Sequence, residues 1–223
     1  MLVVHHLENS RSQRVLWLLE ELGVPYEIKR YQRHPKTMLA PKELKAIHPL
    51  GKSPVIVDDG KVIAESGAIV EYLIDTYGKG RFRPAPGTPE HRAYTYWMHF
   101  AEGSLQPLLL VKLIFDRIET TKAPFFIKPI IKKVAQQAKG LLVVRQLVDY
   151  LDFLESTLTT STWFAGDDIS GADIMMSFPV EAAVARGGLD GTRPQLMAFV
   201  QRIYARPAWK KALEVGGPYD IPS

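Results

Sequence analysis

The sequence predicts a two-part fold, in which an α/β domain is followed by an all-helical domain. In residues 1–82, short strand-like apolar segments alternate with segments of helical periodicity. Strand signals end at a stretch rich in glycine and proline, and the later apolar series all have helical spacing. The 223 residues suffice for two small domains, and a 46% hydrophobic, 23% charged composition is typical of globular proteins.

The first half begins with an apolar strand at residues 2–4. Cap-type residues at 9–12 then precede a helix, since Val15, Leu18, Leu19 and Leu22 share one helical face. Gly23 is expected to end this helix, and Pro25 prevents its continuation. Residues 26–31 alternate in polarity like a second strand, and a short helix is expected to start near Pro41.

A hairpin and a third helix complete this half. Residues 53–57 read as a strand, Asp58-Asp59-Gly60 as a turn, and residues 61–64 as the returning strand. Ser66 is a candidate N-cap for the helix that follows. The predicted order is β-α-β-α-β-β-α, and a unit of this size and order is typical of a thioredoxin-like domain.

The second half is predicted to be helical throughout. We expect a first domain at 1–82, a linker at 83–89 and a helical domain at 90–223, because glycine and proline are concentrated between residues 78 and 89. Helical spacing recurs in four later series, which are Tyr94, Trp97, Met98, Ala101, Leu105 and Leu108; Leu147, Leu151, Leu154 and Leu158; Ile174, Phe178 and Ala182; and Leu196, Phe199, Val200 and Ile203.

Composition excludes several function classes. The chain has no cysteine, which removes disulfides, thiolate metal sites and a nucleophilic or redox-active protein thiol. A net charge of +4, spread over both halves, is weak evidence for nucleic-acid binding. Neither a signal peptide nor a run of ~18 apolar residues is present. We expect a cytoplasmic protein without a nucleic-acid or membrane partner.

The local motifs of common enzyme classes are also missing. There is no glycine-rich phosphate loop, no HExxH and no GxSxG. His5 and His6 are adjacent in the first strand, so one ring should pack inward and the other face outward. No carboxylate or cysteine is spaced to complete a metal site with them, and we expect no metal.

Three short features should converge at one edge of the predicted sheet. They are the polar run at 9–12, the Ser53-Pro54 pair that opens a strand, and Glu65-Ser66 at a helix start. A cis bond before Pro54 would present the backbone of Ser53 outward. The helix start attracts a carboxylate. Taken alone, Pro54 could be an ordinary edge-strand proline and Glu65-Ser66 only a helix start. Together they suit a small extended peptide that carries carboxylates, an ammonium group and a thiol.

At this point the sequence resembles the cytosolic glutathione transferases over nearly its whole length. SRSQRVLWLLEELGVPYE resembles the first helix and second strand of that family, and residues 48–73 resemble its glutathione-site core. FAGDDISGADIMM, residues 164–176, resembles its capping-box segment, in which Ser170 and Asp173 are structural. The resemblance is strongest to a bacterial and fungal subgroup. It implies the glutathione transferase architecture, glutathione as co-substrate, a small hydrophobic electrophile and a homodimer.

The resemblance assigns roles residue by residue. Lys52, aided by Lys36 or His48, should face the glycine carboxylate of glutathione. Ser53 should pair its backbone with the cysteinyl unit, and Pro54 corresponds to the family's cis-proline. The remaining two residues form the γ-glutamyl grip: Glu65 should meet the ammonium group and Ser66 the α-carboxylate.

The residue that activates the thiol is left open between Ser10 and Asn9. Serine-type members use a hydroxyl near the first helix, for which Ser10 is the leading candidate, but an ungapped alignment puts Asn9 at that position. Ser12 and Arg11 are further alternatives. Lowering a thiol pKa from ~8.5 to ~6.5 needs ~2.7 kcal/mol. One charge-assisted hydrogen bond to the thiolate contributes ~1.5–3 kcal/mol, and a helix N-terminus beside it contributes ~0.3–1 kcal/mol. Together they are enough for this shift of the thiol pKa.

The leading hypothesis is conjugation of glutathione to a hydrophobic electrophile, in a pocket between the domains near helix 94–105 and the C-terminal tail. Glutathione-dependent peroxide reduction and a non-catalytic scaffold of the same fold are alternatives. The segment 122–145 carries six basic residues and no acid. It is expected to be a solvated helical face, with an anionic partner or a membrane surface as the alternative.

Overall fold

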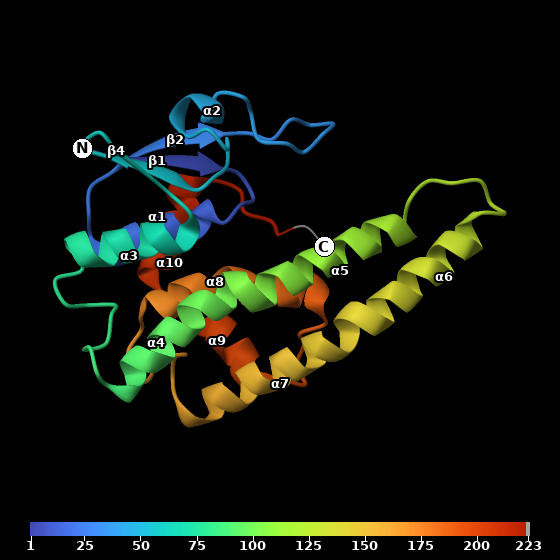
Figure 1. Ribbon diagram of the computed structural model, residues 1–223. Coiled ribbons are helices and arrows are strands. Elements are labelled where there is room, and N and C mark those ends of the chain that lie inside the picture. The colour runs from blue at the N-terminus through green and yellow to red at the C-terminus, as the bar shows by residue number, and fades with distance from the viewer. Residues whose placement is uncertain (222–223) are drawn as a thin grey trace.

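The first half of the molecule is built on a four-stranded sheet (Figure 1). In this computed structural model, which describes residues 1–221, the strands are β1 (Leu2–Leu7), β2 (Glu27–Tyr31), β3 (Val55–Asp58) and β4 (Lys61–Ala64). Their order is β2-β1-β3-β4. The β1 and β2 strands are parallel, whereas β3 is antiparallel to both β1 and β4. This is the predicted α/β arrangement.

Two helices cover one face of this sheet and a short one lies on the other (Figure 1). Helices α1 (Ser12–Leu22) and α3 (Ser66–Tyr77) lie between the sheet and the helical half. Gly23 ends α1 in the left-handed region at φ 69°, as its position predicted. The third helix, α2, covers only Leu44–Ile47. The prediction of a start near Pro41 was wrong, because residues 41–43 form turns that lead into the helix.

The second half is entirely helical in its described residues. Its α-helices are α4 (Pro89–Phe100), α5 (Gln106–Glu119), α6 (Lys128–Lys139), α7 (Arg145–Thr160), α8 (Gly171–Ala182), α9 (Pro194–Ala205) and α10 (Pro207–Gly216). Short π-helical segments join α4 to α5 and α6 to α7, which makes two long antiparallel runs (Figure 1). The predicted helical series fall on these elements, and their apolar faces are buried.

The two halves share one core. Helices α1 and α3 both pack against α8. The start of α8 approaches α3 so closely that a Cβ on Gly171 would lie 2.6 Å from the Ile74 side chain. The connecting segment is fastened at the same place, because the Gly171 N–H donates to the Phe82 carbonyl at 2.8 Å and the Phe82 ring is buried.

Helix α10 returns from the helical half to the first half. It packs against α1 and β2 (Figure 1). The buried rings of Trp17 and Trp209 meet edge to face at 5.3 Å. At the end of α10, Gly216 approaches α1 closely, since a Cβ there would lie 2.8 Å from Gln13 Oε1 and 3.0 Å from Leu16 Cδ1.

Two local expectations need correction. Neither His5 nor His6 faces outward, because both are buried, at 2% and 3% exposure; His5 Nδ1 lies 2.8 Å from the Tyr31 hydroxyl and His6 Nδ1 lies 2.9 Å from Ser12 Oγ. Ser66 is the first residue of α3 and Glu65 is its N-cap, without a side-chain capping bond. Within residues 1–221, no helix has the length and apolar character that a membrane span requires.

Candidate functional site

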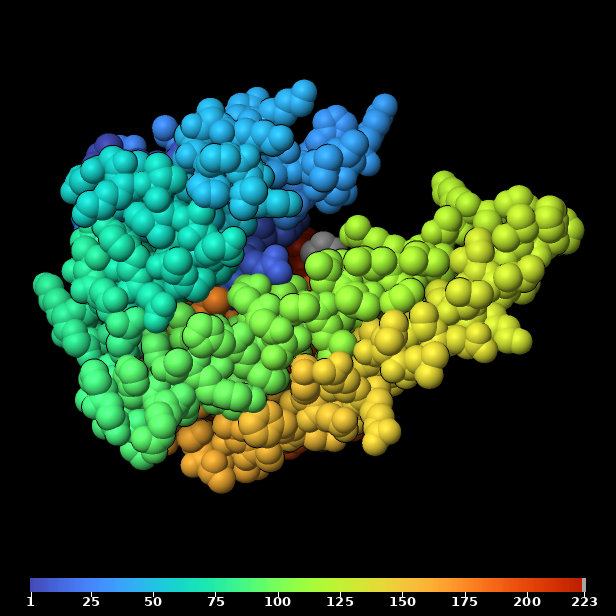
Figure 2. Space-filling model, viewed as in Figure 1, coloured from blue at the N-terminus to red at the C-terminus, as the bar shows by residue number. Residues whose placement is uncertain are grey.

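A cleft of about 300 Å³ lies between the sheet edge and the helical half. Its walls come from the β3 and β4 ends, the start of α3, the start of α1 and the π-helical segment after α4. Figure 2 shows the molecule hollowed between the first half and the green helices α4 and α5. The cleft is lined by Arg11, His48, Leu50, Lys52, Ser53, Pro54, Ala64, Glu65, Ser66 and Glu102.

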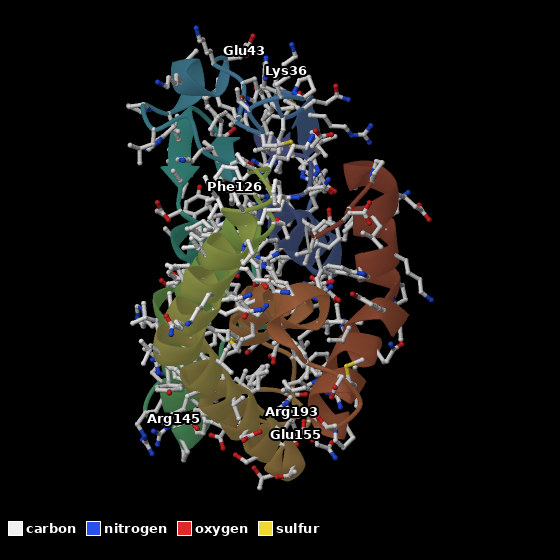
Figure 3. The ribbon with its side chains drawn as sticks, turned by 90° about the vertical axis from the view of Figure 1, so that its right-hand side faces the viewer. Lys36, Glu43, Phe126, Arg145, Glu155 and Arg193 are labelled. Atoms are coloured by element: carbon white, nitrogen blue, oxygen red, sulfur yellow. The ribbon has the colours of Figure 1, made fainter. Side chains whose placement is uncertain are left out.

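The structure therefore brings together five of the predicted site residues, Lys52, Ser53, Pro54, Glu65 and Ser66. His48 joins them, but Lys36 is not part of the lining and lies on the outer loop of the first half (Figure 3). A larger cavity of about 630 Å³ lies at the connector between the halves, and it contains none of the predicted residues.

Ser53 connects the cleft to the end of β1. Its hydroxyl donates to the His5 carbonyl at 2.9 Å and accepts from the Leu7 N–H at 3.2 Å. The bond between Ser53 and Pro54 is cis. Because the side chain is held by β1, the backbone of Ser53 at the cleft is the part left to meet a ligand.

Glu65 and Ser66 line the end of the cleft where α3 begins. Glu65 has a backbone φ of 72°, a conformation that non-glycine residues rarely adopt. Such strain is concentrated at functional sites. Ser66 begins the twelve-residue helix α3, whose first N–H groups have no intrahelical acceptor and attract a carboxylate.

Ser10 lies in the turn before α1 with its side chain buried at 6% exposure. Its Oγ accepts from the Ser12 N–H at 3.2 Å and lies 2.8 Å from Ser12 Oγ. Ser12 Oγ lies 2.9 Å from His6 Nδ1 and 3.2 Å from the Leu7 carbonyl oxygen. A run of hydrogen bonds thus leads from Ser10 into the interior.

The histidine gives this run its direction. Burial, followed by the positive charge of Arg30, lowers the pKa of His6 to about 4, so the ring is neutral at pH 7. The ring also makes a hydrogen bond to the backbone of Gly216, which needs a ring N–H. Since Nδ1 faces Ser12, Nδ1 is an acceptor, and the single Ser12 proton goes to Nδ1 or to the Leu7 carbonyl; in both cases Ser12 accepts from Ser10. Ser10 then donates to Ser12, and its proton is already in use.

Asn9 is bound differently. It has a backbone φ of 49°, which asparagine tolerates better than most residues. Its Oδ1 accepts from the Asp220 N–H in the C-terminal tail at 2.7 Å. Because the amide accepts through Oδ1, its Nδ2 is the end that donates. The tail therefore selects the orientation of this amide.

A charged group at the cleft was missed by the sequence analysis. Glu102 accepts from Arg11 Nε at 3.1 Å and also pairs with Arg14, which is 1% exposed and donates to the Met175 carbonyl at 2.7 Å. Burial by itself raises the pKa of Glu102, but the two arginines together lower it below its usual range. No motif signals this group, because its members are 91 and 88 residues apart.

The predicted capping box is present at the start of α8 and is structural. The buried Asp173 accepts from the backbone N–H groups of Ser170 and Phe164, each at 2.8 Å. Ser170 Oγ accepts from the Ala172 N–H at 3.2 Å. Among the residues that the structure describes, no group of three or more metal-ligating side chains is placed to hold a metal ion.

Comparisons with known proteins agree with this geometry. Residues 10–76 match the family model "Glutathione S-transferase, N-terminal domain", and residues 116–207 match "Glutathione S-transferase, C-terminal domain". Glutathione S-transferase 3 of Schizosaccharomyces pombe is 40% identical, over 96% of this chain and 87% of its own. Glutathione S-transferase 1 of Saccharomyces cerevisiae is 35% identical, over 82% and 81%.

Solved structures show the same fold. A glutathione S-transferase from Actinobacillus pleuropneumoniae is 32% identical with a TM-score of 0.78, over 99% of this chain and 95% of that one. A sphingomonad glutathione S-transferase solved with glutathione has a TM-score of 0.72 at 20% identity, over 96% and 98%. The chain belongs to the glutathione S-transferase family, and the architecture predicted from the sequence is confirmed.

Proposed function

We propose that this glutathione transferase binds glutathione in the 300 Å³ cleft and stabilises its thiolate for attack on a hydrophobic electrophile. The observation that carries the proposal is the convergence of Lys52, Ser53, Glu65 and Ser66 on one cleft. The names of the relatives support the same co-substrate. Conjugation of this kind would serve detoxification.

Each end of the tripeptide has a partner of opposite charge. Lys52, with His48 beside it, would bind the glycine carboxylate. The backbone of Ser53, next to Pro54, would pair with the cysteinyl unit as an added strand. Glu65 would bind the γ-glutamyl ammonium group, and Ser66 with the α3 N-terminus would bind the α-carboxylate.

We assign the sulfur's hydrogen-bond donor to Asn9 in preference to Ser10. The Ser10 hydroxyl is buried and its proton is directed to Ser12, whereas the Asn9 amide is held through its oxygen by the Asp220 N–H. Arg11 lines the same cleft, paired with Glu102. One amide hydrogen bond to a thiolate contributes ~1.5–3 kcal/mol, which lowers a thiol pKa by ~1–2 units.

The electrophile would bind beside the cleft, along the first turns of α5. Leu110, Val111 and Ile114 are exposed there, at 46%, 36% and 50%, and offer an apolar surface. Peroxide reduction by the same thiolate remains the alternative reaction. A scaffold role would require that the intact cleft binds glutathione without turnover.

Three broader expectations also stand as proposals. We propose a cytoplasmic location, a homodimer, and a division into domains 1–82 and 90–223, of which residues 222–223 lie outside the described part. Tyr96 and Phe153 support the homodimer, because both are exposed and their rings lie 6.2 Å apart on α4 and α7. A solution mass near twice 25.1 kDa would agree with a dimer.

The test is a glutathione titration of the wild type, Asn9→Ala and Ser10→Ala, following thiolate absorbance against pH. We expect the wild type to bind, Ser10→Ala to resemble it, and Asn9→Ala to bind with a thiol pKa ~1–2 units higher. The reverse order would assign the donor to Ser10. A wild type that does not bind glutathione would overturn the proposal.

Turnover assays with an aromatic electrophile and with an organic hydroperoxide distinguish the three functions. Conjugation consumes the electrophile, peroxide reduction consumes the hydroperoxide, and a scaffold consumes neither.

A further inference from the structure

The helical hairpin of α5 and α6 projects beyond the rest of the molecule (Figures 1 and 2). We call residues 120–134, its connecting loop and the first turns of α6, the hairpin tip. Figure 3 views the molecule from this side, with Phe126 near the loop and Arg145 far from it, where α7 begins. In these views the tip is a convex end of the hairpin.

The tip is unusually apolar for an exposed segment. Phe125 is 84% exposed and Phe126 64%, and their rings contact each other edge to face at 5.5 Å. On α6, Ile130 and Val134 are exposed at 63% and 59% and lie one turn apart on the same side. Side chains of this size in water indicate an interaction surface.

Lysines surround these apolar side chains. Lys122, Lys128, Lys132 and Lys133 are exposed, and within the described chain none of them forms an ion pair. The nearest acids of the hairpin, Asp116 and Glu119, already pair with Lys139. No acidic residue occurs between Glu119 and Asp149. Apart from a longer-range attraction between Lys132 and Glu119, the positive charge of the tip is therefore not compensated by the hairpin.

We propose that the hairpin tip docks on an anionic phospholipid bilayer, with Phe125 and Phe126 inserted at the headgroup level and the four lysines among the lipid phosphates. Aromatic rings that enter the interface beside lysines that contact anionic headgroups are the chemistry of peripheral membrane binding. Charge argues against a second copy at this place, because two tips would bring lysines against lysines in a protein of net charge +4.

Docking through the tip leaves the glutathione cleft free. Helix α5 runs from the tip back to Gln106, close in sequence to Glu102 of the cleft. A hydrophobic electrophile dissolves preferentially in the bilayer, so docking would bring the enzyme to it. This consequence depends on the proposed function, whereas the docking itself does not.

The test is co-sedimentation of the whole protein with vesicles of phosphatidylcholine alone or with about 30% phosphatidylserine. We expect the protein to bind only to the anionic vesicles. The substitutions Phe125→Ser/Phe126→Ser should weaken this binding at least tenfold, and so should the quadruple variant Lys122→Ser/Lys128→Ser/Lys132→Ser/Lys133→Ser. Leu141→Ser/Leu142→Ser is the matched apolar control, since those residues are 85% and 60% exposed away from the tip. The charge control is the quadruple variant Lys42→Ser/Lys61→Ser/Lys79→Ser/Lys210→Ser, because these four lysines are also exposed. Both controls should bind as the wild type does.

The absence of cysteine allows a second measurement in the same vesicles. An environment-sensitive dye on Thr121→Cys, in the tip, should shift to the blue, while the same dye on Thr159→Cys at the end of α7 should not. Equal binding to both kinds of vesicle, or loss of binding in the controls as well, would overturn the proposal. A change in solution mass caused only by the tip substitutions would assign the surface to a second copy instead. Glutathione titration of the tip variants tests the cleft separately.

Discussion

Glu65 combines a backbone conformation that suits glycine with a carboxylate that lines the cleft. At φ 72° and ψ 127°, a residue with a Cβ costs ~1–3 kcal/mol relative to an unstrained one. The first hydrogen bond of α3, from the Ile69 N–H to the Glu65 carbonyl at 2.9 Å, holds the residue in place. Folding therefore has to offset strain at a position where the carboxylate is expected to bind the ammonium group.

The substitution Glu65→Gly should separate these two effects. We expect the free energy of unfolding to rise by ~1 kcal/mol, because the relief of strain exceeds the ~0.5–1 kcal/mol entropic cost of glycine. Glutathione affinity should fall about tenfold or more with loss of the charged partner. Urea unfolding and calorimetric titration measure the two quantities. Glu65→Gln is the control, with weaker binding and no gain in stability; a less stable glycine variant would contradict the argument.

The residues of the site were predictable to different degrees. The Ser53-Pro54 and Glu65-Ser66 pairs lie on local motifs, and the structure places both pairs in the cleft. The choice between Asn9 and Ser10 was not predictable, because it depends on contacts with His6 and with Asp220, 211 residues away. Spacing along the chain carries no information about such contacts.

Helix α8 is the element that joins the parts of the molecule, and its two ends are held differently. Its start is held by the capping box of Ser170 and Asp173. Near its end, the buried Glu181 accepts from the Tyr219 hydroxyl of the tail at 2.9 Å. Burial raises the pKa of Glu181 to about 7, although Tyr219, Tyr204 and Arg14 act in the opposite direction.

Removing the cap should cost a modest amount of stability. We expect Ser170→Ala to lower the free energy of unfolding by ~1 kcal/mol, since one N–H at the start of α8 loses its acceptor. Chemical denaturation measures the change. The exposed Ser156→Ala should stay within ~0.5 kcal/mol of the wild type, and an equal effect of the two substitutions would show that the cap is not specific.

Glu181 should make stability fall as the pH rises. Between about pH 4.5, where the unfolded carboxyl titrates, and about pH 7, the folded protein keeps a proton that the unfolded chain releases. The stability from the neutral form is complete below this window and is lost across it, on the order of 3 kcal/mol. Denaturation of Glu181→Gln at several pH values should show a flatter profile than the wild type. Parallel profiles would mean that Glu181 is ionised in the folded protein.

At the scale of the whole molecule, a charged group ties the halves together. Arg14 of α1 is fully buried against α8, and Glu102 from the segment after α4 is its counter-ion. Burial lowers the pKa of Arg14, while Glu102 opposes this. A buried pair of this kind adds little net stability, but removal of one partner leaves a charge uncompensated.

The substitution Glu102→Ala is therefore expected to lower the free energy of unfolding by ~1.5–3 kcal/mol, in one cooperative transition, because Glu102 is 32% exposed and water replaces part of the interaction. Replacing both partners, as in Arg14→Met/Glu102→Leu, should recover most of that loss. Urea unfolding followed by circular dichroism measures both variants. The exposed pair of Lys211 and Glu214 offers a control, because Lys211→Ala should change stability by less than ~1 kcal/mol. A small effect of Glu102→Ala would show that water or another group compensates Arg14.

The division of the fold into its two halves was predictable, because apolar residues recur with one spacing in strands and with another in helices. Apolar spacing identified α7, α8 and α9, and turn residues identified the β3–β4 hairpin. The π-helical joints and the projection of the hairpin were not predictable. A π segment changes the register by only one residue, and apolar residues such as Phe125 and Phe126 look alike in sequence whether they are buried or exposed.

The return of α10 to α1 has a consequence for the synthesis of the protein. Chains leave the ribosome from the N-terminus at roughly 5–20 residues per second, and early domains usually fold first. Here the Trp17 face of α1 is completed only by Trp209. The first half therefore cannot complete this part of its core before residues 207–216 have been synthesised. Until α10 has emerged from the exit tunnel, the apolar face of α1 that it covers stays open to chaperones.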